Sequence, residues 1–253
     1  MKFISLFAGI GGFELGLERA GMECVGQVEY NPFCQRVLKK HWPHVKLVGD
    51  IHDVTESDFG AVDLICGGFP CQPFSSAGRR NGKNDPRFLW PEMLRVVKAY
   101  RPDWVLGENV VGIVKMALGD IRDSLEEEGY KCQPFIIPAC AVGAPHQRER
   151  VWIVARNITG ARTPQVGGVC EGKNADCNRS IEIERFWYKH AEPEMGGVVH
   201  GISRRLDRIT ALGNSVVPQV VEVIGRAIRR AHVMCAERLQ DTNETANTQS
   251  TKG

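Results

Sequence analysis

The sequence predicts an α/β fold in which strands and helices alternate to build a doubly wound sheet. Short apolar runs of strand length recur along the first 155 residues, separated by stretches with apolar residues at helical spacing. The first run leads into a glycine-rich turn, and the acidic residue Glu29 follows Gly9 after about 20 residues, as in dinucleotide-binding folds. A chain of 253 residues suffices for one large domain, or one large and one small.

The first unit consists of a strand, a helix and a second strand. Residues 3–8 form the first strand, a helix follows until Gly21, and residues 24–30 form the second strand. The connecting turn, Gly9-Ile10-Gly11-Gly12, departs from the full dinucleotide spacing and has no phosphate-binding lysine. An adenosine-containing ligand without a pyrophosphate therefore fits at least as well. A turn that only joins strand to helix is the alternative.

A second helix and a third strand come next. Residues 31–41 are predicted to be helical with Pro32 in the first turn, and residues 45–48 form a short strand ending in Gly49-Asp50-Ile51. Asp50 could accept a hydrogen bond from an adenine amino group while Ile51 packs on the ring. A helix-capping or turn aspartate is an equally good interpretation of Asp50.

A cysteine stands on a stiff loop after the fourth strand, at residues 61–66. The next segment, residues 67–76, holds two glycines and two prolines that stop the strand and prevent a helix. Cys71 is therefore expected at the carboxyl end of a strand, where open α/β sheets bind their ligands. Its local context fits a nucleophile and a buried structural thiol equally well.

A glutamate is predicted to lie beside that loop. A helix over residues 89–100 precedes a strand at residues 104–106, which runs into Gly107-Glu108-Asn109-Val110. Glu108 thus stands at another carboxyl end, among apolar neighbours. Desolvation is expected to raise the pKa of its carboxyl group, which could then donate a proton to a bound base.

Two arginines precede the last predicted strand, at residues 151–155. The segment before it reads Pro145-His146-Gln147-Arg148-Glu149-Arg150. Because strand side chains repeat every two residues, Arg148 and Arg150 are expected to point the same way. Charges at a sheet edge, paired with Glu149, are the alternative.

The remaining segments are less regular. A helix over residues 113–128 and an extended segment over 130–139 lead to the arginines, and residues 157–201 form a loop-rich insert. An amphipathic helix is predicted at residues 220–233. The polar residues 240–253 are expected to be disordered.

Charge is distributed unevenly along the chain. The net charge of +2 does not by itself indicate nucleic acid, but local basic clusters suit a phosphate backbone, with a solvated basic face as the alternative. The clusters comprise Arg79, Arg80, Lys83, Arg87, Arg95, Lys98 and Arg101, and then Arg204, Arg205 and Arg208.

The nine cysteines have no framework spacing, and no secretory segment is recognised before them, so we expect a reducing cytoplasm. Cys170 and Cys177 lack the second pair that a zinc site would need, and we expect no metal. No apolar run reaches the roughly 20 residues that span a bilayer.

Taken together, six blocks resemble the conserved segments of the cytosine-C5 DNA methyltransferases, in order and spacing. The resemblance covers about residues 1–155 and 203–230. The blocks are Phe7-Ala8-Gly9-Ile10-Gly11-Gly12-Phe13, Gly49-Asp50-Ile51, Phe69-Pro70-Cys71-Gln72-Pro73-Phe74-Ser75, Glu108-Asn109-Val110, Gln147-Arg148-Glu149-Arg150-Val151 and Gly213-Asn214-Ser215-Val216-Val217.

The resemblance implies a class I S-adenosylmethionine-dependent methyltransferase, and the chemistry of these residues agrees with it. Cys71 would add to C6 of a flipped cytosine, Glu108 would hydrogen-bond N3 and the exocyclic amine, and Arg150, with Arg148 beside it, would hold O2. The implied S-adenosylmethionine site comprises Phe7, Ala8, Gly9, Ile10, Gly11, Gly12, Glu29, Tyr30, Asp50, Ile51, Pro70, Leu89, Asn214, Ser215 and Val216. The expected contacts to double-stranded DNA are Gln72, Ser75, Arg79, Arg80, Arg179, Arg185, Arg204 and Arg205.

On this interpretation residues 1–156 are the catalytic and cofactor-binding domain and residues 157–203 a small recognition lobe. Residues 204–236 return to the catalytic domain, and residues 237–253 are a disordered tail. The lobe is shorter than the family usually carries, so an RNA (tRNA) cytosine-C5 methyltransferase on the same scaffold is one alternative. A non-catalytic DNA-binding regulator is another. We expect a monomer without an obligate protein partner.

Overall fold

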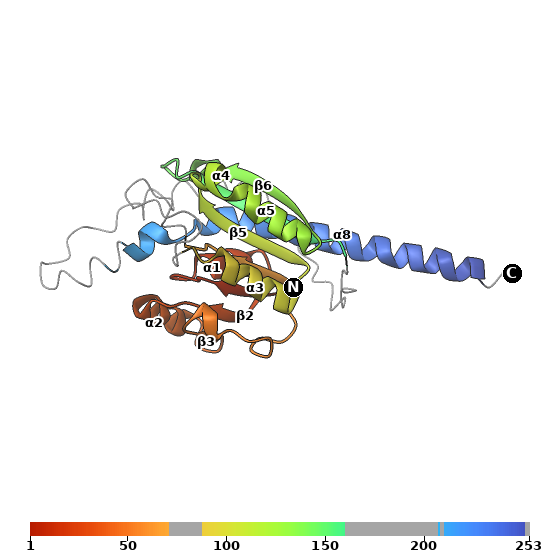
Figure 1. Ribbon diagram of the computed structural model, residues 1–253, viewed down its shortest axis with the longest axis horizontal. Coiled ribbons are helices and arrows are strands. Elements are labelled where there is room, and N and C mark those ends of the chain that lie inside the picture. The colour runs from red at the N-terminus through yellow and green to blue at the C-terminus, as the bar shows by residue number, and fades with distance from the viewer. Residues whose placement is uncertain (71–87, 160–206, 208–209, 251–253) are drawn as a thin grey trace, which may run out of the picture.

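The computed structural model describes residues 1–70, 88–159, 207 and 210–250, with side chains placed as far as residue 234 (Figure 1). Its centre is a seven-stranded sheet in the order β3-β2-β1-β4-β5-β7-β6. The strands are β1 (Lys2–Leu6), β2 (Glu23–Val28), β3 (Lys46–Val48), β4 (Leu64–Gly67), β5 (Trp104–Val110), β6 (Tyr130–Ile137) and β7 (Arg150–Asn157). β1 to β5 are parallel to one another, whereas β7 runs antiparallel to both β5 and β6. The predicted α/β class and doubly wound sheet are confirmed.

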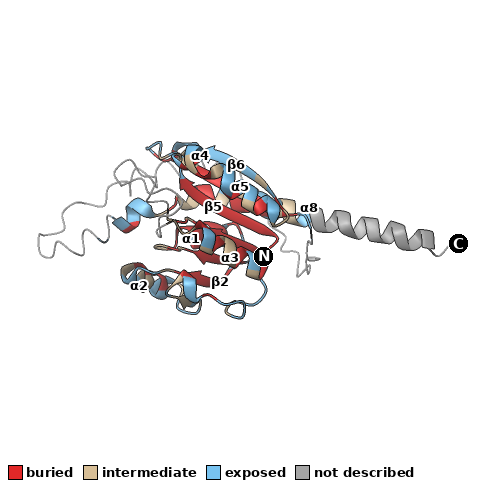
Figure 2. Ribbon diagram, in the orientation of Figure 1, coloured by how far each residue is buried: buried red, intermediate tan, exposed pale blue. Residues whose placement is uncertain are grey.

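Helices cover both faces of the sheet, because successive strand side chains point to opposite sides. They are α1 (Gly12–Arg19), α2 (Pro32–His41), α3 (Trp90–Tyr100), α4 (Ile113–Met116), α5 (Leu118–Glu127) and α8 (Pro218–Ser250), with 3-10 turns η1 (Ile51–Asp53) and η4 (Ala139–Val142). On one face, Ile4 packs with apolar residues of α3, α4 and α5. On the other face its neighbour Phe3 packs with those of α1 and α8. β1, β2, β4, β5 and β7 are mostly buried between these layers, whereas the edge strands β3 and β6 are largely exposed or half-buried (Figure 2).

α1 and α8 lie close together because glycines face the contact. A side chain at Gly16 would collide with Val221, and one at Gly225 would come within 3.0 Å of Ala20 Cβ. This close packing fixes the C-terminal helix against the helix that follows the glycine turn, although the two lie near opposite ends of the sequence.

Among the element boundaries that differ from the predictions, three bear on the site or on the length of a helix. β5 continues to Val110, so Glu108 and Asn109 lie within the strand rather than after it. The predicted helix over residues 113–128 is two helices, because Ala117 has φ of −148° and interrupts it. α8 continues to Ser250, where disorder was predicted from residue 237; no glycine or proline stands between Arg226 and Ser250 to end the helix.

Among the helices that the structure describes, none combines the length and apolarity that a bilayer crossing requires. Within the same described residues, no group of three potential metal ligands occurs. Residues 160–206, which include most of the expected recognition lobe and Cys170 and Cys177, lie outside the described part of the chain.

Candidate active site

Cys71 lies outside the described residues, but the chain on both sides of its segment is in place. Phe69 ends the path from β4, and its ring contacts Phe88 at 6.5 Å and Trp90 at 5.1 Å between ring centroids. The described residues on the two sides of positions 71–87 are therefore in contact with each other. Asn109 Nδ2 donates to the Phe69 carbonyl at 3.0 Å, which ties the start of the cysteine segment to β5.

Glu108 is buried at the carboxyl end of β5, next to this segment. A Cβ atom at Gly68 would lie 3.1 Å from Glu108 Oε2, so the glycine leaves room for the carboxyl group. Desolvation raises the pKa of Glu108 to about 7, and the nearby charges of Arg150 and Arg148 oppose this rise. The predicted rise in the pKa of Glu108 is confirmed.

Arg150 is the partner of that carboxyl group. It begins β7 opposite Val110, and its Nε lies 2.9 Å from Glu108 Oε1. Its Nη1 donates to the Glu149 carbonyl at 2.8 Å. The antiparallel pairing of β7 with β5 thus brings together a carboxyl group and a guanidinium group that are far apart in sequence.

Arg148 has hydrogen-bond partners different from those of Arg150, although both guanidinium groups act on Glu108. Arg148 precedes β7 and has φ of 34°, so the period-two rule of a strand does not apply to it. Its Nη2 donates to the carbonyls of Gly213 at 2.7 Å and Ser215 at 2.8 Å. The guanidinium remains close enough to Glu108 to lower the pKa of that carboxyl group.

The glycine turn lies at the carboxyl end of β1. Phe7, Gly9 and Gly11 all have positive φ values, 55°, 59° and 93°, which bend the chain sharply between β1 and α1. A Cβ atom at Gly9 would meet nothing within 4 Å, so the turn is open on that side. At Gly11 a side chain would instead collide with the ring of Trp42. Ala8 is buried, and Ile10 is half-buried.

Glu29 closes this turn from the end of β2. Its Oε2 accepts a hydrogen bond from Gly9 N–H at 2.7 Å, and its Oε1 accepts one from Asn31 N–H, also at 2.7 Å. The neighbouring Tyr30 side chain is 77% exposed. The carboxylate therefore stands at the mouth of the turn beside an aromatic ring that faces solvent.

Asp50 caps the 3-10 turn η1 at the end of β3, which is one of the two interpretations left open by the sequence. Its Oδ1 accepts from His52 N–H at 3.0 Å and lies 2.6 Å from His52 Nδ1. These two contacts hold the pKa of Asp50 below its usual range. Ile51 is buried, and Leu89 caps α3 without a side-chain bond. The adenine contact expected of Asp50 stays a prediction.

The segment before α8 packs onto the glycine turn. A Cβ atom at Gly12 would lie 2.8 Å from Val216 Cγ2 and 2.9 Å from Ser215 Oγ. Asn214 is exposed. The structure thus brings Ser215 and Val216 to the turn at Gly12, as the cofactor prediction requires. Pro70 is half-buried next to the cysteine segment.

Part of the predicted basic patch has an internal role. Arg95 donates to the carbonyls of Ile51 at 2.6 Å and Val54 at 3.0 Å, and Lys98 and Arg101 pair with Glu128. These three cations therefore have partners within the fold, and their place on a nucleic-acid face stays a prediction. The predicted DNA contacts Gln72, Ser75, Arg79, Arg80, Arg179, Arg185, Arg204 and Arg205, together with Lys83, Arg87 and Arg208, lie outside the described residues.

Sequence reasoning missed the residues that hold the site in shape. Asn109, Trp42 and Arg95 each support a predicted site segment through a backbone or ring contact. Only Asn109 belongs to one of the six blocks, where it follows Glu108 directly. The other two act across long sequence separations that no local pattern records.

Comparison with known proteins identifies one family. The model of the C-5 cytosine-specific DNA methylases matches residues 1–165. The type II methyltransferase M.HgiCII of Herpetosiphon aurantiacus is 38% identical over 159 residues, which are 60% of this chain and 36% of that protein. The type II methyltransferase M.HhaI of Haemophilus parahaemolyticus is 35% identical over 159 residues, which are 61% of this chain and 48% of that protein.

Solved structures give the same result. A DNMT2 mutant of Spodoptera frugiperda superposes with a TM-score of 0.53 and 28% identity over 66% of this chain and 53% of that one. The Dnmt2 methyltransferase of S. pombe superposes with a TM-score of 0.52 and 26% identity over 62% of this chain and 51% of that one. The chain spans about half the length of these relatives or less.

Proposed function

Because this chain belongs to the C-5 cytosine-specific DNA methylase family, we propose that it methylates C5 of cytosine in a short DNA sequence. The seven-stranded α/β sheet is the class I methyltransferase fold that this family implies. The observation that carries the proposal is the ion pair between buried Glu108 and half-buried Arg150, 2.9 Å apart, next to Gly68 in the chain that leads to Cys71.

The pair explains how a cytosine ring would be activated. C5 becomes nucleophilic only after a thiolate adds to C6, and Cys71 is the proposed nucleophile. Glu108, with a pKa of about 7, can hold a proton near neutral pH and donate it toward N3 of the ring. Arg150 would stabilise the negative charge that builds on O2. After methyl transfer, loss of the C5 proton and elimination would release Cys71 and the methylated base.

The cofactor proposal rests on three strand ends. The open side of the turn at Gly9, the carboxylate of Glu29 and the Asp50-Ile51 segment follow β1, β2 and β3, which are adjacent in the sheet. Each carboxylate oxygen of Glu29 accepts one hydrogen bond from the backbone, and each can accept a second. Glu29 can therefore also hold ribose hydroxyls. These residues fit S-adenosylmethionine, which would supply the methyl group when bound.

We propose duplex DNA as the substrate, with the target base flipped out of the stack at a cost of about a few kcal/mol, because C6 is inaccessible inside a helix. Residues 157–203 are the proposed recognition lobe.

We further propose that the protein is a cytoplasmic monomer. Sedimentation of the purified chain with and without DNA would test the monomeric state.

Plasmid methylation tests the activity directly. Plasmid DNA from cells expressing the protein should gain 5-methylcytosine in one short motif, which bisulfite sequencing would read. Cys71→Ser should abolish the modification, whereas Arg122→Ala, which removes an exposed ion pair on α5, should leave it intact. An unmodified plasmid together with newly methylated tRNA would contradict DNA as the substrate.

A trapping experiment tests the covalent step. In DNA containing 5-fluorocytosine within the motif, the C5 substituent cannot leave as a proton, so Cys71 should stay attached to C6. A denaturant-stable protein–DNA adduct, mapped to Cys71 by mass spectrometry, is expected in the presence of S-adenosylmethionine. Absence of that adduct on DNA that the enzyme methylates would contradict the mechanism.

A further inference from the structure

We propose that Arg148 is a positioning residue that fixes the Gly213–Val216 segment against the cofactor turn, rather than a contact to the cytosine base. The inference deepens the proposed function and rests on it. Arg148 Nη2 lies 2.7 Å from the Gly213 carbonyl oxygen and 2.8 Å from that of Ser215, so one nitrogen holds two points of the segment. The donor is charged, and such hydrogen bonds are stronger than those between neutral groups.

The segment needs an external donor at this place. Residues 210–214 form a short helical turn, and Ser215 N–H already bonds back to the Ala211 carbonyl at 3.0 Å. The last carbonyls of a helical turn have no partner within it and are satisfied from elsewhere. Arg148 supplies that partner for Gly213 from the strand side of the site.

The backbone at Arg148 supports the same role. Its φ of 34° is in the left-handed region, which residues other than glycine rarely adopt. Arg148 donates to the Gly213 and Ser215 carbonyls, whereas Arg150, two residues later, pairs with Glu108. The two arginines therefore hold different parts of the site.

The segment in turn contacts the glycine turn. Val216 Cγ2 and Ser215 Oγ occupy the space next to Gly12, where a Cβ atom would lie 2.8 Å and 2.9 Å from them. Arg148 thus connects the entry to β7, where the Glu108–Arg150 pair lies, with the turn proposed to hold the cofactor. Displacing the segment would disturb the cofactor site while leaving the pair in place.

The two roles for Arg148 predict different kinetic effects. A positioning residue of the cofactor segment governs cofactor affinity, which can be measured without DNA. A base contact governs only the steps that involve DNA, and its removal lowers kcat/KM for DNA with unchanged cofactor binding.

The test uses the full chain and S-adenosylhomocysteine as the probe in isothermal titration calorimetry. Arg148→Met keeps a long side chain but no donor, and its Kd should rise about tenfold or more, equivalent to about 1.4 kcal/mol. Arg148→Lys keeps the charge and should recover part of the affinity. Arg226→Ala, on the exposed side of α8 and paired only with Glu222 among the described residues, is the matched control and should bind as the wild type does.

Steady-state kinetics complete the test. At saturating S-adenosylmethionine, Arg148→Met should keep kcat within about threefold, since positioning losses of this kind appear in KM. Unchanged cofactor affinity in both Arg148 variants, with a fall in kcat/KM for DNA, would overturn the inference. Melting temperatures and circular dichroism show whether each variant is folded. A wild type that binds S-adenosylhomocysteine but methylates no DNA would contradict the proposed function. The affinities of the Arg148 variants for S-adenosylhomocysteine would still test the positioning role of Arg148.

Discussion

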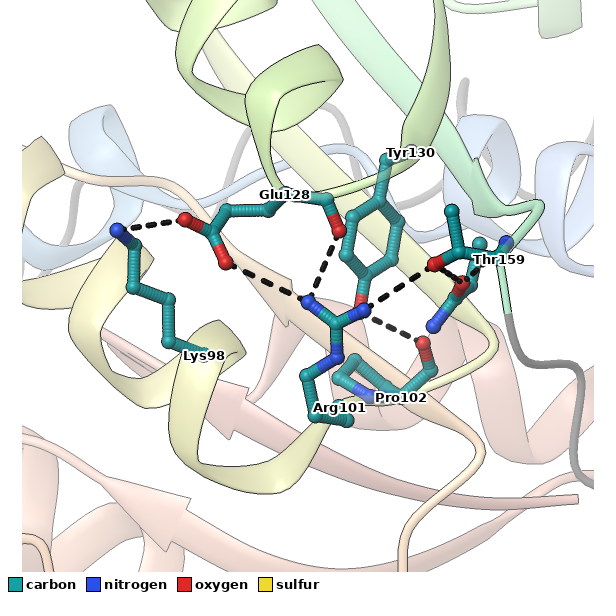
Figure 3. A network of polar contacts seen from close by, with 7 residues as sticks. Lys98, Arg101, Pro102, Glu128, Tyr130 and Thr159 are labelled. Atoms are coloured by element: carbon teal, nitrogen blue, oxygen red, sulfur yellow. Dashed lines mark hydrogen bonds and ion pairs between the residues drawn. The ribbon is translucent and has the colours of Figure 1, made fainter.

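At the amino end of the sheet, charged and polar side chains bond to one another and to backbone carbonyls, whereas the carboxyl end buries two carboxyl groups with raised pKa values. The amino-end contacts join α3, α5, β6 and the chain after β7 (Figure 3). Arg101 Nη1 donates to the Glu128 carbonyl at 2.9 Å, and its Nη2 donates to Thr159 Oγ1 at 3.3 Å. Tyr130 donates from its hydroxyl to the Pro102 carbonyl at 2.8 Å.

At the carboxyl end, burial dominates. Desolvation raises the pKa of Glu108 to about 7 in spite of Arg150, and it raises that of Glu14 in α1 to about 7 as well. Glu14 Oε1 accepts from Gln27 Nε2 at 3.1 Å, while its Oε2 has no hydrogen-bond partner within the described residues. The amino end therefore anchors the fold, and the carboxyl end tolerates a cost in stability to keep carboxyl groups protonated near neutral pH.

The largest effect is expected for Glu108→Gln. The amide can still accept a hydrogen bond from Arg150 but cannot donate a carboxyl proton to N3, so kcat should fall about 10²- to 10⁴-fold. In the wild type, log kcat/KM should decline above about pH 7, where Glu108 loses its proton. Rates of tritiated methyl transfer, measured for both proteins between about pH 6 and 9, would test the fall in kcat and the pH dependence. A wild-type rate that stays constant above pH 7, with a nearly active variant, would contradict a proton donor.

Glu14→Gln should change stability rather than chemistry. The folded-state pKa of about 7 exceeds the ordinary 4.5, so the folded protein binds the extra proton and its free energy of unfolding falls as pH rises from about 4.5 to 7. At about pH 8 the free energy of unfolding of Glu14→Gln should exceed that of the wild type by up to about 3 kcal/mol. The difference should vanish near about pH 4. Urea unfolding across this range measures it. Parallel pH profiles for the two proteins would contradict a buried titrating carboxyl group at this position.

Tyr130→Phe tests the anchoring end. The hydroxyl is buried, and its loss leaves the Pro102 carbonyl without that donor, which should lower the free energy of unfolding by about 1–3 kcal/mol. The ring and its contact with Arg101 remain. Methylation at a temperature where the variant is folded should equal that of the wild type. A loss of activity without a loss of stability would show that the two ends of the sheet are not separable in this way.

The same contrast explains what the sequence alone could predict. Apolar runs and the glycine-rich turn predict the strands and the residues at their carboxyl ends, because buried strands and positive φ values favour particular residues locally. The hydrogen bonds of Arg148 could not be predicted, because its φ of 34° departs from strand geometry and its partners, Gly213 and Ser215, are distant in sequence. The roles of Arg95 and Asn109 were out of reach, since each bonds to a backbone group that only the fold brings near. Pairing of β7 between β5 and β6 likewise depends on long-range contacts.

The smallest effect is expected for Lys98→Ala. Lys98 Nζ lies 2.7 Å from Glu128 Oε1, but its side chain is 51% exposed, and exposed ion pairs contribute about 0–1 kcal/mol. Arg101 meets the same Glu128 and also donates to the backbone and to Thr159, so Arg101→Ala should cost more. Urea unfolding at low and high salt would separate the two, because only the Lys98 contribution is mainly Coulombic and screened. Equal losses in both variants would mean that Glu128, rather than the backbone contacts of Arg101, anchors this end of the sheet.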